Sequence, residues 1–198
     1  MKISAAYSTI RHSILNKLAV GLAPNLYYHC VEHTIDVLTQ AERMAKIENL
    51  TDDEIYRLQL ACLYHDSGFL TTYTAHEIAG CDFARKELTR FGVTDTDIRI
   101  ICGMIMATHI PQTPLTRLEE IICDADLDYL GREDFSLISH NLFRELHARQ
   151  MIKSEQEWNL VQINFFRQHS YFTDATNKLR GPLKSKHLAM IEATICRD

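Results

Sequence analysis

Two residues that can bind a metal ion, His65 and Asp66, stand side by side in the segment Leu63–Gly68. They end an apolar helical segment, and Gly68 is a residue type that commonly follows a helix end. If this helix end is buried, the imidazole and the carboxylate lose their water and need polar partners, and a bound cation can be one. If it is exposed, they need none. The phase of the neighbouring helices decides between the two interpretations.

Other ionisable side chains also continue apolar helix faces. His65 follows Cys62 by three residues, so it extends the apolar face of its helix. The same spacing of three or four residues places ionisable residues on apolar faces of four further helices: His33, His76, His109 and Asp126. A single histidine of this kind is usually a core residue bonded to backbone. Asp66 and Asp126 indicate a cation site, because buried carboxylates rarely lack a cation.

The predicted group therefore combines imidazole nitrogens with carboxylate oxygens. Such a mixture suits Mn, Fe, Co or Zn better than Mg. We expect a divalent metal cofactor, present as one or two ions. Six cysteines occur without any C-x-x-C pair, and we interpret them as reduced thiols, mostly within the core.

The elements that position these residues are all expected to be helices. Apolar residues make up 46% of the 198 residues and recur in helical phase, which predicts an all-α multi-helix bundle. The expected helices span about 4–20, 27–46, 51–66, 74–91, 94–109, 117–130, 134–150, 155–172 and 184–196. Capping boxes are expected at three helix starts: Thr51/Glu54, Thr74/Glu77 and Ser154/Glu157. Gly181-Pro182 is expected to separate the last helix from the preceding chain.

Composition limits the partners and the location. No linker or repeat divides the chain, so we expect a single domain over residues 1–198. The net charge of −5 disfavours binding to a nucleic-acid duplex or to an anionic membrane. No apolar run approaches the roughly 20 residues that span a bilayer. Residues 1–13 lack the apolar block of a secretory signal, so we expect a cytoplasmic protein.

Three segments resemble the HD superfamily of metal-dependent phosphohydrolases (HD/PDEase domain), whose pattern is H…HD…D on a helical bundle. The matching text is Tyr28-His29-x-x-x-His33, Tyr64-His65-Asp66-Ser67-Gly68 and Asp124-Ala125-Asp126-Leu127-Asp128. The resemblance covers a core motif region of about residues 27–131, and residues 134–196 are expected as additional C-terminal helices of the same HD-type domain.

The resemblance implies a ligand set. His33, His65, Asp66 and Asp126 would hold one ion, with Asp124 and Asp128 as rivals for the last place. In family members with two ions, further histidines hold the second ion and the aspartate of the HD pair bridges both. This implies that role for His76 and His109. Asp66 is the expected catalytic residue, since it would orient the metal-bound water, and His29 is expected to support the ligands.

The resemblance also implies the reaction. We expect a hydrolase that cleaves a phosphomonoester, phosphodiester or nucleotide by attack of a metal-activated water, with a small phosphorylated molecule as substrate. One alternative is a di-iron oxygenase of the same fold, because imidazole and carboxylate ligands serve both chemistries. A third interpretation is a non-catalytic helical module that binds a nucleotide or a partner, which the complete ligand set disfavours.

One position departs from the family. Many members carry a lysine directly after the glycine of H-D-x-G, and this chain has Phe69 there. Phosphate contacts must then come from elsewhere, and Arg132 is one candidate. A second is a basic run that we interpret mainly as a solvated helix face: Lys178, Arg180, Lys184, Lys186 and His187.

Overall fold

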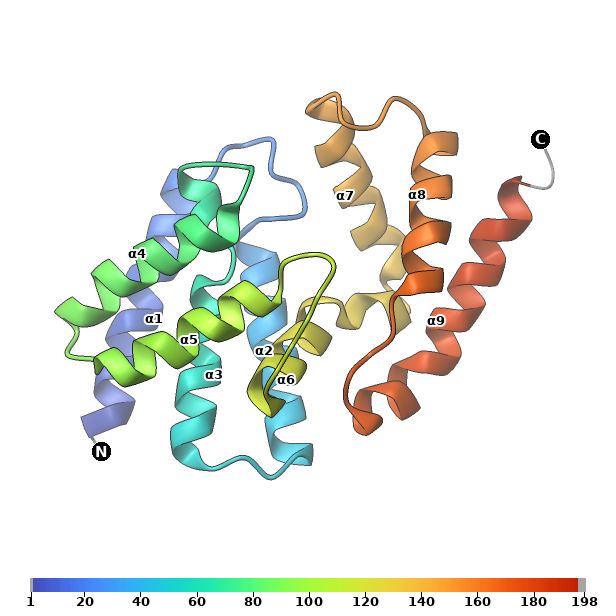
Figure 1. Ribbon diagram of the computed structural model, residues 1–198. Helices are drawn as coiled ribbons and strands as arrows, with labels where there is room; N and C mark the ends of the chain where they lie inside the picture. Colours follow the sequence, from blue (N-terminus) through green and yellow to red (C-terminus); the bar gives the residue numbers. More distant parts are fainter. Residues whose placement is uncertain (1, 196–198) are drawn as a thin grey trace. The chain divides into compact units, whose positions relative to one another are not determined.

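The structure, a computed structural model, describes residues 2–195 of the backbone and the side chains of residues 6–195. Within this range the chain forms nine α-helices, two 3₁₀ helices and no strand, which confirms the all-α prediction (Figure 1). Cys196, the predicted end of the last helix, lies outside the described residues. The elements are α1 (Lys2–Gly21), α2 (Val31–Ile47), α3 (Asp52–Tyr64), η1 (Ser67–Leu70), α4 (His76–Arg90), α5 (Asp95–Ala107), α6 (Arg117–Asp126), η2 (Asp128–Gly131), α7 (Phe135–Ala148), α8 (Glu155–Gln168) and α9 (Asp174–Ile195).

The chain groups into two compact units. Unit 1 contains α1 to α6 with η1, and unit 2 contains η2 and α7 to α9 together with Pro24–Tyr28. Each unit has its own cluster of buried apolar side chains. The expectation of one domain over residues 1–198 stays a prediction.

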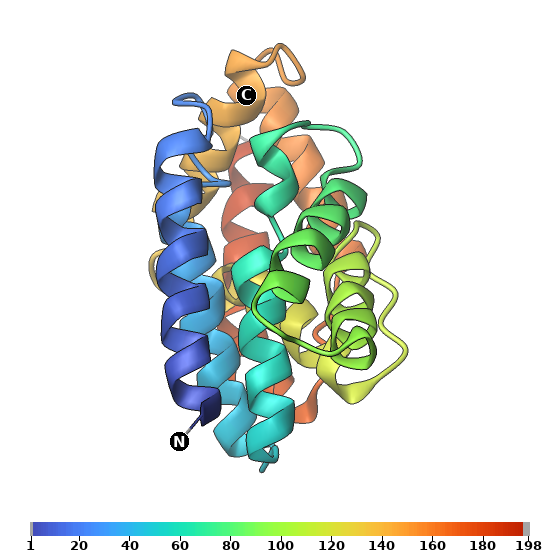
Figure 2. The same ribbon diagram turned by 90° about the vertical axis from the view of Figure 1, so that its left-hand side faces the viewer.

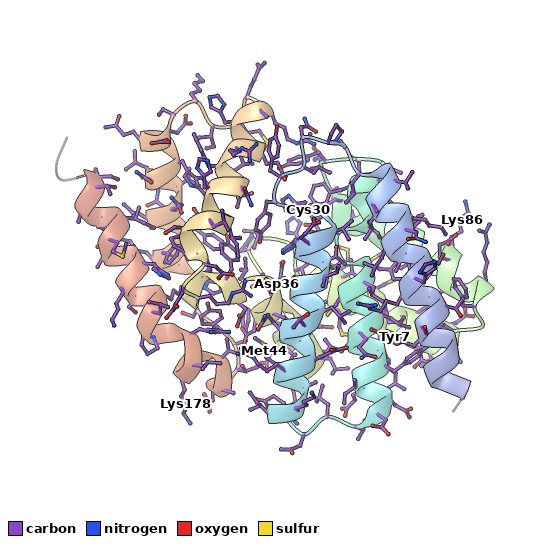
Figure 3. All side chains as sticks on the ribbon, turned by 180° about the vertical axis from the view of Figure 1, so that it is seen from behind. Tyr7, Cys30, Asp36, Met44, Lys86 and Lys178 are labelled. Atoms are coloured by element: carbon purple, nitrogen blue, oxygen red, sulfur yellow. The ribbon has the colours of Figure 1, made fainter. Side chains whose placement is uncertain are left out.

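Unit 1 is built around three long helices, α1, α2 and α3, which run alongside one another (Figure 2). Their apolar faces are almost fully buried, as at Ile14, Val37 and Leu60. Figure 3 shows Cys30 at the start of α2 and Met44 near its end. Five cysteines lie among the described side chains, all of them free thiols and four of them buried.

The helix starts agree with the predicted caps in part. Thr51 and Glu54 form the expected capping box at α3. Ser154 caps α8 by accepting from the Glu157 amide, but the Glu157 carboxylate accepts from Lys153 instead of completing the box.

The cap predicted at Thr74/Glu77 is wrong. α4 begins at His76, and its N-cap is Ala75 in a left-handed conformation, with φ of 53° and no side-chain cap hydrogen bond. The physical reason is that packing sets this turn. An added Cβ at Gly68 would lie 1.9 Å from the His76 carbonyl oxygen. One at Gly80 would lie 3.2 Å from the His65 carbonyl oxygen. The two glycines thus let η1 and the first turns of α4 meet backbone to backbone.

The predicted break at Gly181-Pro182 is also wrong, because α9 continues through Pro182. Contacts with η2 hold the helix on both sides of the proline. Before it, Arg180 donates to the Asp128 carboxylate at 2.8 Å. After it, Nδ1 of His187 lies 2.9 Å from the Leu130 carbonyl oxygen. Tertiary packing therefore outweighs the one backbone hydrogen bond that a proline removes.

Residues 127–130 were predicted to continue the helix that begins at Arg117, but α6 ends at Asp126. Leu127 links α6 to η2, which contains residues 128–130. None of the helices within the described range is both long enough and apolar enough to cross a membrane.

Candidate metal centre

Three helices of unit 1 bring predicted ligands together. His33 lies in the first turn of α2, His65 directly follows α3, and Asp126 is the last residue of α6. Asp66 follows His65 and precedes η1. One ligand atom each of His33, His65 and Asp66 lies within 4.8 Å of the other two, and all three residues are buried.

The distances within this group are short. Nε2 of His33 lies 3.3 Å from Nε2 of His65 and 3.1 Å from Oδ1 of Asp126. Oδ2 of Asp66 lies 3.4 Å from the His33 nitrogen and 3.2 Å from the His65 nitrogen. Two imidazole nitrogens and two carboxylate oxygens therefore converge on one small volume.

A backbone contact fixes the orientation of His65. Its Nδ1 lies 2.8 Å from the Cys62 carbonyl oxygen, which can only accept a hydrogen bond. Nδ1 must then carry a proton, so Nε2 is the nitrogen that faces the group, and in the neutral ring it is the electron-pair donor. This is the usual arrangement behind a metal-binding histidine.

The charges and hydrogen bonds of this group bear on whether it could hold a cation. Burial lowers the pKa of His65, but the Asp66 and Asp126 carboxylates and the Cys62 carbonyl together outweigh burial and raise that pKa to about 9. Burial likewise raises the pKa of Asp66, but the imidazoles of His65, His76 and His29 together outweigh burial and hold that pKa well below its ordinary value. Oδ2 of Asp66 is buried and accepts no hydrogen bond from the described residues. Nitrogen and oxygen donors that face one another in this way fit a shared cation.

Asp66 presents its second oxygen to a different imidazole. Oδ1 of Asp66 lies 3.5 Å from Nε2 of His76, whereas Oδ2 faces His33 and His65. The backbone contacts of Gly68 and Gly80 bring the start of α4 to this position. The two oxygens of one carboxylate thus address two sets of nitrogen donors.

His109 is placed differently from the other predicted ligands. It lies two residues beyond the end of α5 with an exposed side chain, and it is not part of the close group of His33, His65 and Asp66. Its role as a ligand stays a prediction.

Glu77 is a residue that sequence reasoning assigned to a helix cap only. Its side chain is buried, and Oε1 lies 3.5 Å from Nε2 of His76. The one feature of the sequence that pointed to this contact is that Glu77 directly follows the predicted ligand His76.

A cluster of rings lies against the same group. The Phe69 ring lies 4.0 Å from the His76 ring and 4.3 Å from the His29 ring, centre to centre, with interplanar angles of 22° and 30°. Tyr73 meets Phe69 edge-on at 5.2 Å. The His29 ring lies 6.1 Å from that of His33 and 6.0 Å from that of His76. His29 is therefore near imidazoles on both sides of Asp66.

The basic candidates for phosphate lie in unit 2, and three of them have side-chain partners there. Arg180 pairs with Asp128 at 2.8 Å, and Arg132 pairs with Asp134 at 2.7 Å. Lys184 donates to the His169 carbonyl oxygen. These contacts give the three residues structural partners within unit 2.

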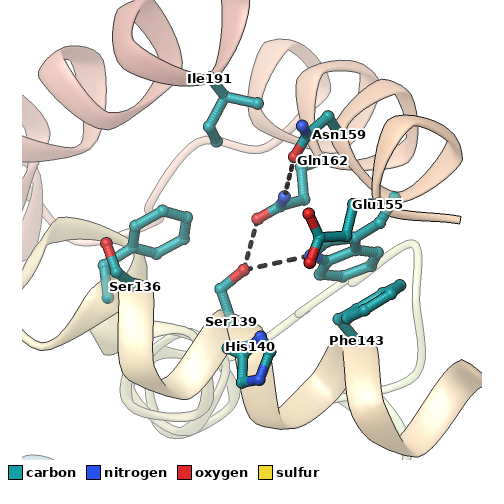
Figure 4. A pocket seen from close by; sticks show the side chains of 10 residues that line it. Ser136, Ser139, His140, Phe143, Glu155, Asn159, Gln162 and Ile191 are labelled. Carbon is teal, nitrogen blue, oxygen red and sulfur yellow. Dashed lines mark hydrogen bonds between the residues drawn. The ribbon is translucent and has the colours of Figure 1, made fainter. Parts of the chain in front are cut away.

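Unit 2 also contains a pocket of about 220 Å³ lined by residues of α7, α8 and α9 (Figure 4). The Trp158 indole donates to the Ser139 hydroxyl at 3.3 Å, and that hydroxyl donates to Gln162 at 2.6 Å. Gln162 in turn donates to Asn159 at 3.2 Å. These hydrogen bonds join α7 to α8 and give four of the lining side chains polar partners within the pocket wall.

Comparison with known proteins matches one family. The HD domain model matches residues 30–128, which is half of the chain and includes every residue predicted to hold a metal ion. No curated protein and no solved structure matches the chain.

Proposed function

Because this chain belongs to the HD domain family, we propose that it is a metal-dependent phosphohydrolase acting on a phosphomonoester, phosphodiester or nucleotide. One observation carries the proposal. His33, His65 and Asp66 bring buried ligand atoms within 4.8 Å of one another, with Oδ1 of Asp126 3.1 Å from the His33 nitrogen.

The ligand roles follow from which atoms face each other. His33, His65, Asp66 and Asp126 would hold one divalent ion. A second ion would be held by Asp66 and His76, whose Oδ1 and Nε2 atoms lie 3.5 Å apart, together with His109. Such cations supply Lewis acidity, which activates water near neutral pH and stabilises charge on a phosphoryl oxygen.

Asp66 and His65 organise the reacting groups. The Asp66 carboxylate accepts a hydrogen bond from the attacking water and so orients it towards phosphorus. His65 keeps a proton on Nδ1 through the Cys62 carbonyl, so Nε2 is the nitrogen that would bind an ion, after losing its own proton. Without an ion, the protonated His65 ring beside Asp66 holds the pKa of this carboxyl well below its ordinary value, so Asp66 is charged at neutral pH.

His29 is the residue we assign to the substrate. It is half-buried, and its ring lies about equally far from the His33 and His76 rings, at 6.1 and 6.0 Å. An imidazole at this place can donate a hydrogen bond to a phosphoryl oxygen, or a proton to the leaving oxygen. It supplies a polar donor beside Phe69, where the chain has no lysine.

The test is a panel of nucleotides and phosphate esters, assayed with Mn, Fe, Co, Mg and Zn in turn. We expect hydrolysis that depends on the added metal. Asp66→Ala should abolish turnover and lower bound metal while helix content, measured by circular dichroism, stays near that of the wild type. Asp82→Ala is the matched control, since Asp82 is exposed on α4 and pairs with Arg85.

Two results would contradict the proposal. Full hydrolytic activity in Asp66→Ala would show that this carboxylate has no catalytic role. A mixed-valence di-iron EPR signal in the purified protein, with no hydrolysis under any metal, would favour the oxygenase instead.

A further inference from the structure

Phe69 is buried, yet it belongs to neither of the two clusters of buried apolar side chains. It lies in η1, three residues after Asp66, and only 7% of it is exposed. A phenyl ring has no polar atom and cannot contact phosphate through a hydrogen bond. Its nearest aromatic neighbours are the imidazoles of His76 and His29, at 4.0 and 4.3 Å.

The glycine contacts fix the backbone of His76 but not its ring. Gly68 and Gly80 hold the first turns of α4 against η1. The imidazole still has two rotatable bonds, and turning about either would move Nε2 away from Oδ1 of Asp66, 3.5 Å distant. The Phe69 ring is stacked on the imidazole at an interplanar angle of 22°, and this contact restricts that rotation. Tyr73, edge-on at 5.2 Å, supports Phe69 in turn.

His29 is held by the same ring. It precedes α2, so no helical hydrogen-bond pattern sets its side-chain direction. The contact with Phe69 keeps its imidazole near both His33 and His76. One apolar residue thus touches a proposed ligand and the proposed substrate contact.

We propose that Phe69 is a positioning residue, which holds the His76 imidazole towards Asp66 for the second ion and the His29 imidazole towards the substrate. This inference rests on the proposed function, in which His76 is a ligand of that ion. It assigns a role to the position where the chain departs from the H-D-x-G-K pattern.

The experiment is a Mn²⁺ titration of the metal-free protein, with bound ions counted by EPR and affinities taken from calorimetry. In Phe69→Leu we expect the second ion to bind about 10–100-fold more weakly, the usual effect of losing an outer partner of a ligand. The first ion should bind as in the wild type. Phe69→Tyr keeps the ring and should restore the second affinity.

Phe83→Leu is the matched control. Phe83 lies on α4, packs against the apolar core of unit 1, and has Tyr64 as a ring neighbour at 6.1 Å. This variant should lose thermal stability without changing either Mn²⁺ affinity. A merely structural role for Phe69 predicts that Phe69→Leu behaves in the same way.

The outcomes separate the two proposals. If the wild type binds two ions, His76→Ala loses one, and Phe69→Leu keeps both at wild-type affinity, the inference about Phe69 is wrong and the metal centre stands. Equal weakening of both ions in Phe69→Leu would also overturn it. If the wild type binds one ion, or His76→Ala still binds two, the second-ion role of His76 fails, and the inference fails with it.

Discussion

Asp66 illustrates how much a single carboxylate can organise. Its Oδ2 faces His33 and His65, and its Oδ1 faces His76. One carboxylate thus connects two groups of imidazoles, because each of its oxygens is directed at a different group. In the segment Asp124–Asp128, Asp126 and Asp128 have different contact partners, so experiments can separate their roles.

Asp126 and Asp128 were rivals for one ligand position, and their contacts predict opposite phenotypes. Oδ1 of Asp126 lies 3.1 Å from the His33 nitrogen, whereas Asp128 is fully buried in unit 2 and pairs with Arg180. Asp126→Asn should weaken Mn²⁺ binding at least about tenfold, since even outer partners of ligands have effects of that size. Its stability should change little. Calorimetric titration measures the affinity.

Asp128→Asn should do the reverse. It leaves the Arg180 guanidinium beside a neutral amide, and breaking a buried ion pair costs about 3–5 kcal/mol. Urea unfolding should record that loss while Mn²⁺ affinity stays at the wild-type value. Loss of metal binding in Asp128→Asn without loss of stability would reverse the assignment of the two residues.

Residue spacing could predict which side chains turn inward, because helix phase is a local property. His33 and His65 continue apolar stripes, and the structure buries both. The place of Glu77 beside His76, and of Phe69 against two imidazoles, depends on how η1 meets α4. Such contacts join segments whose mutual packing leaves no periodic signal in the sequence.

At the scale of elements, the meeting of η1 with α4 depends on two glycines. A Cβ at Gly68 would lie 1.9 Å from the His76 carbonyl oxygen, a distance that requires backbone movement. Gly68→Ala should therefore destabilise the protein by about 3 kcal/mol or more, at the upper end of overpacking effects. It should also weaken the second metal site. Urea unfolding and Mn²⁺ titration measure the two effects.

Gly181→Ala is the control for that substitution. Gly181 lies inside α9, and an added Cβ meets nothing within 4 Å. Alanine is the better helix former, so this variant should gain about 0.5–1 kcal/mol. If both alanine variants were equally stable, close packing at Gly68 would not be what positions α4.

The errors of helix prediction share a cause. Thr51 could be recognised as a cap because the capping box is local. Thr74 has the same local pattern, but the packing of η1 moves the N-cap of α4 one residue on, to Ala75, in a left-handed conformation. Pro182 predicts a break in the helix, but contacts with η2 hold α9 on both sides of this proline. In both cases tertiary contacts outweigh a local preference of about 1–3 kcal/mol.

At the scale of the whole molecule, the proposed ligands are all contributed by unit 1. His33, His65, Asp66, His76, His109 and Asp126 belong to it, and unit 2 contributes none of them. Metal should therefore stabilise unit 1 directly. Mn²⁺ at about 100 times its dissociation constant adds about 2.7 kcal/mol to the folded state. For a chain of this size that corresponds to a rise in Tm of about 5–10 °C.

Thermal unfolding of chelator-treated protein, with and without Mn²⁺, measures this shift, and hydrogen exchange locates it. Added protection should appear in α2 and α6, which carry His33 and Asp126, and in α3, which His65 directly follows, and should be smallest in α7 and α8. Asp66→Ala should show neither the shift nor the added protection, because it removes the carboxylate shared by both sets of imidazoles. An equal shift in Asp66→Ala would place the stabilising ion elsewhere on the protein and would contradict a metal centre built on this carboxylate.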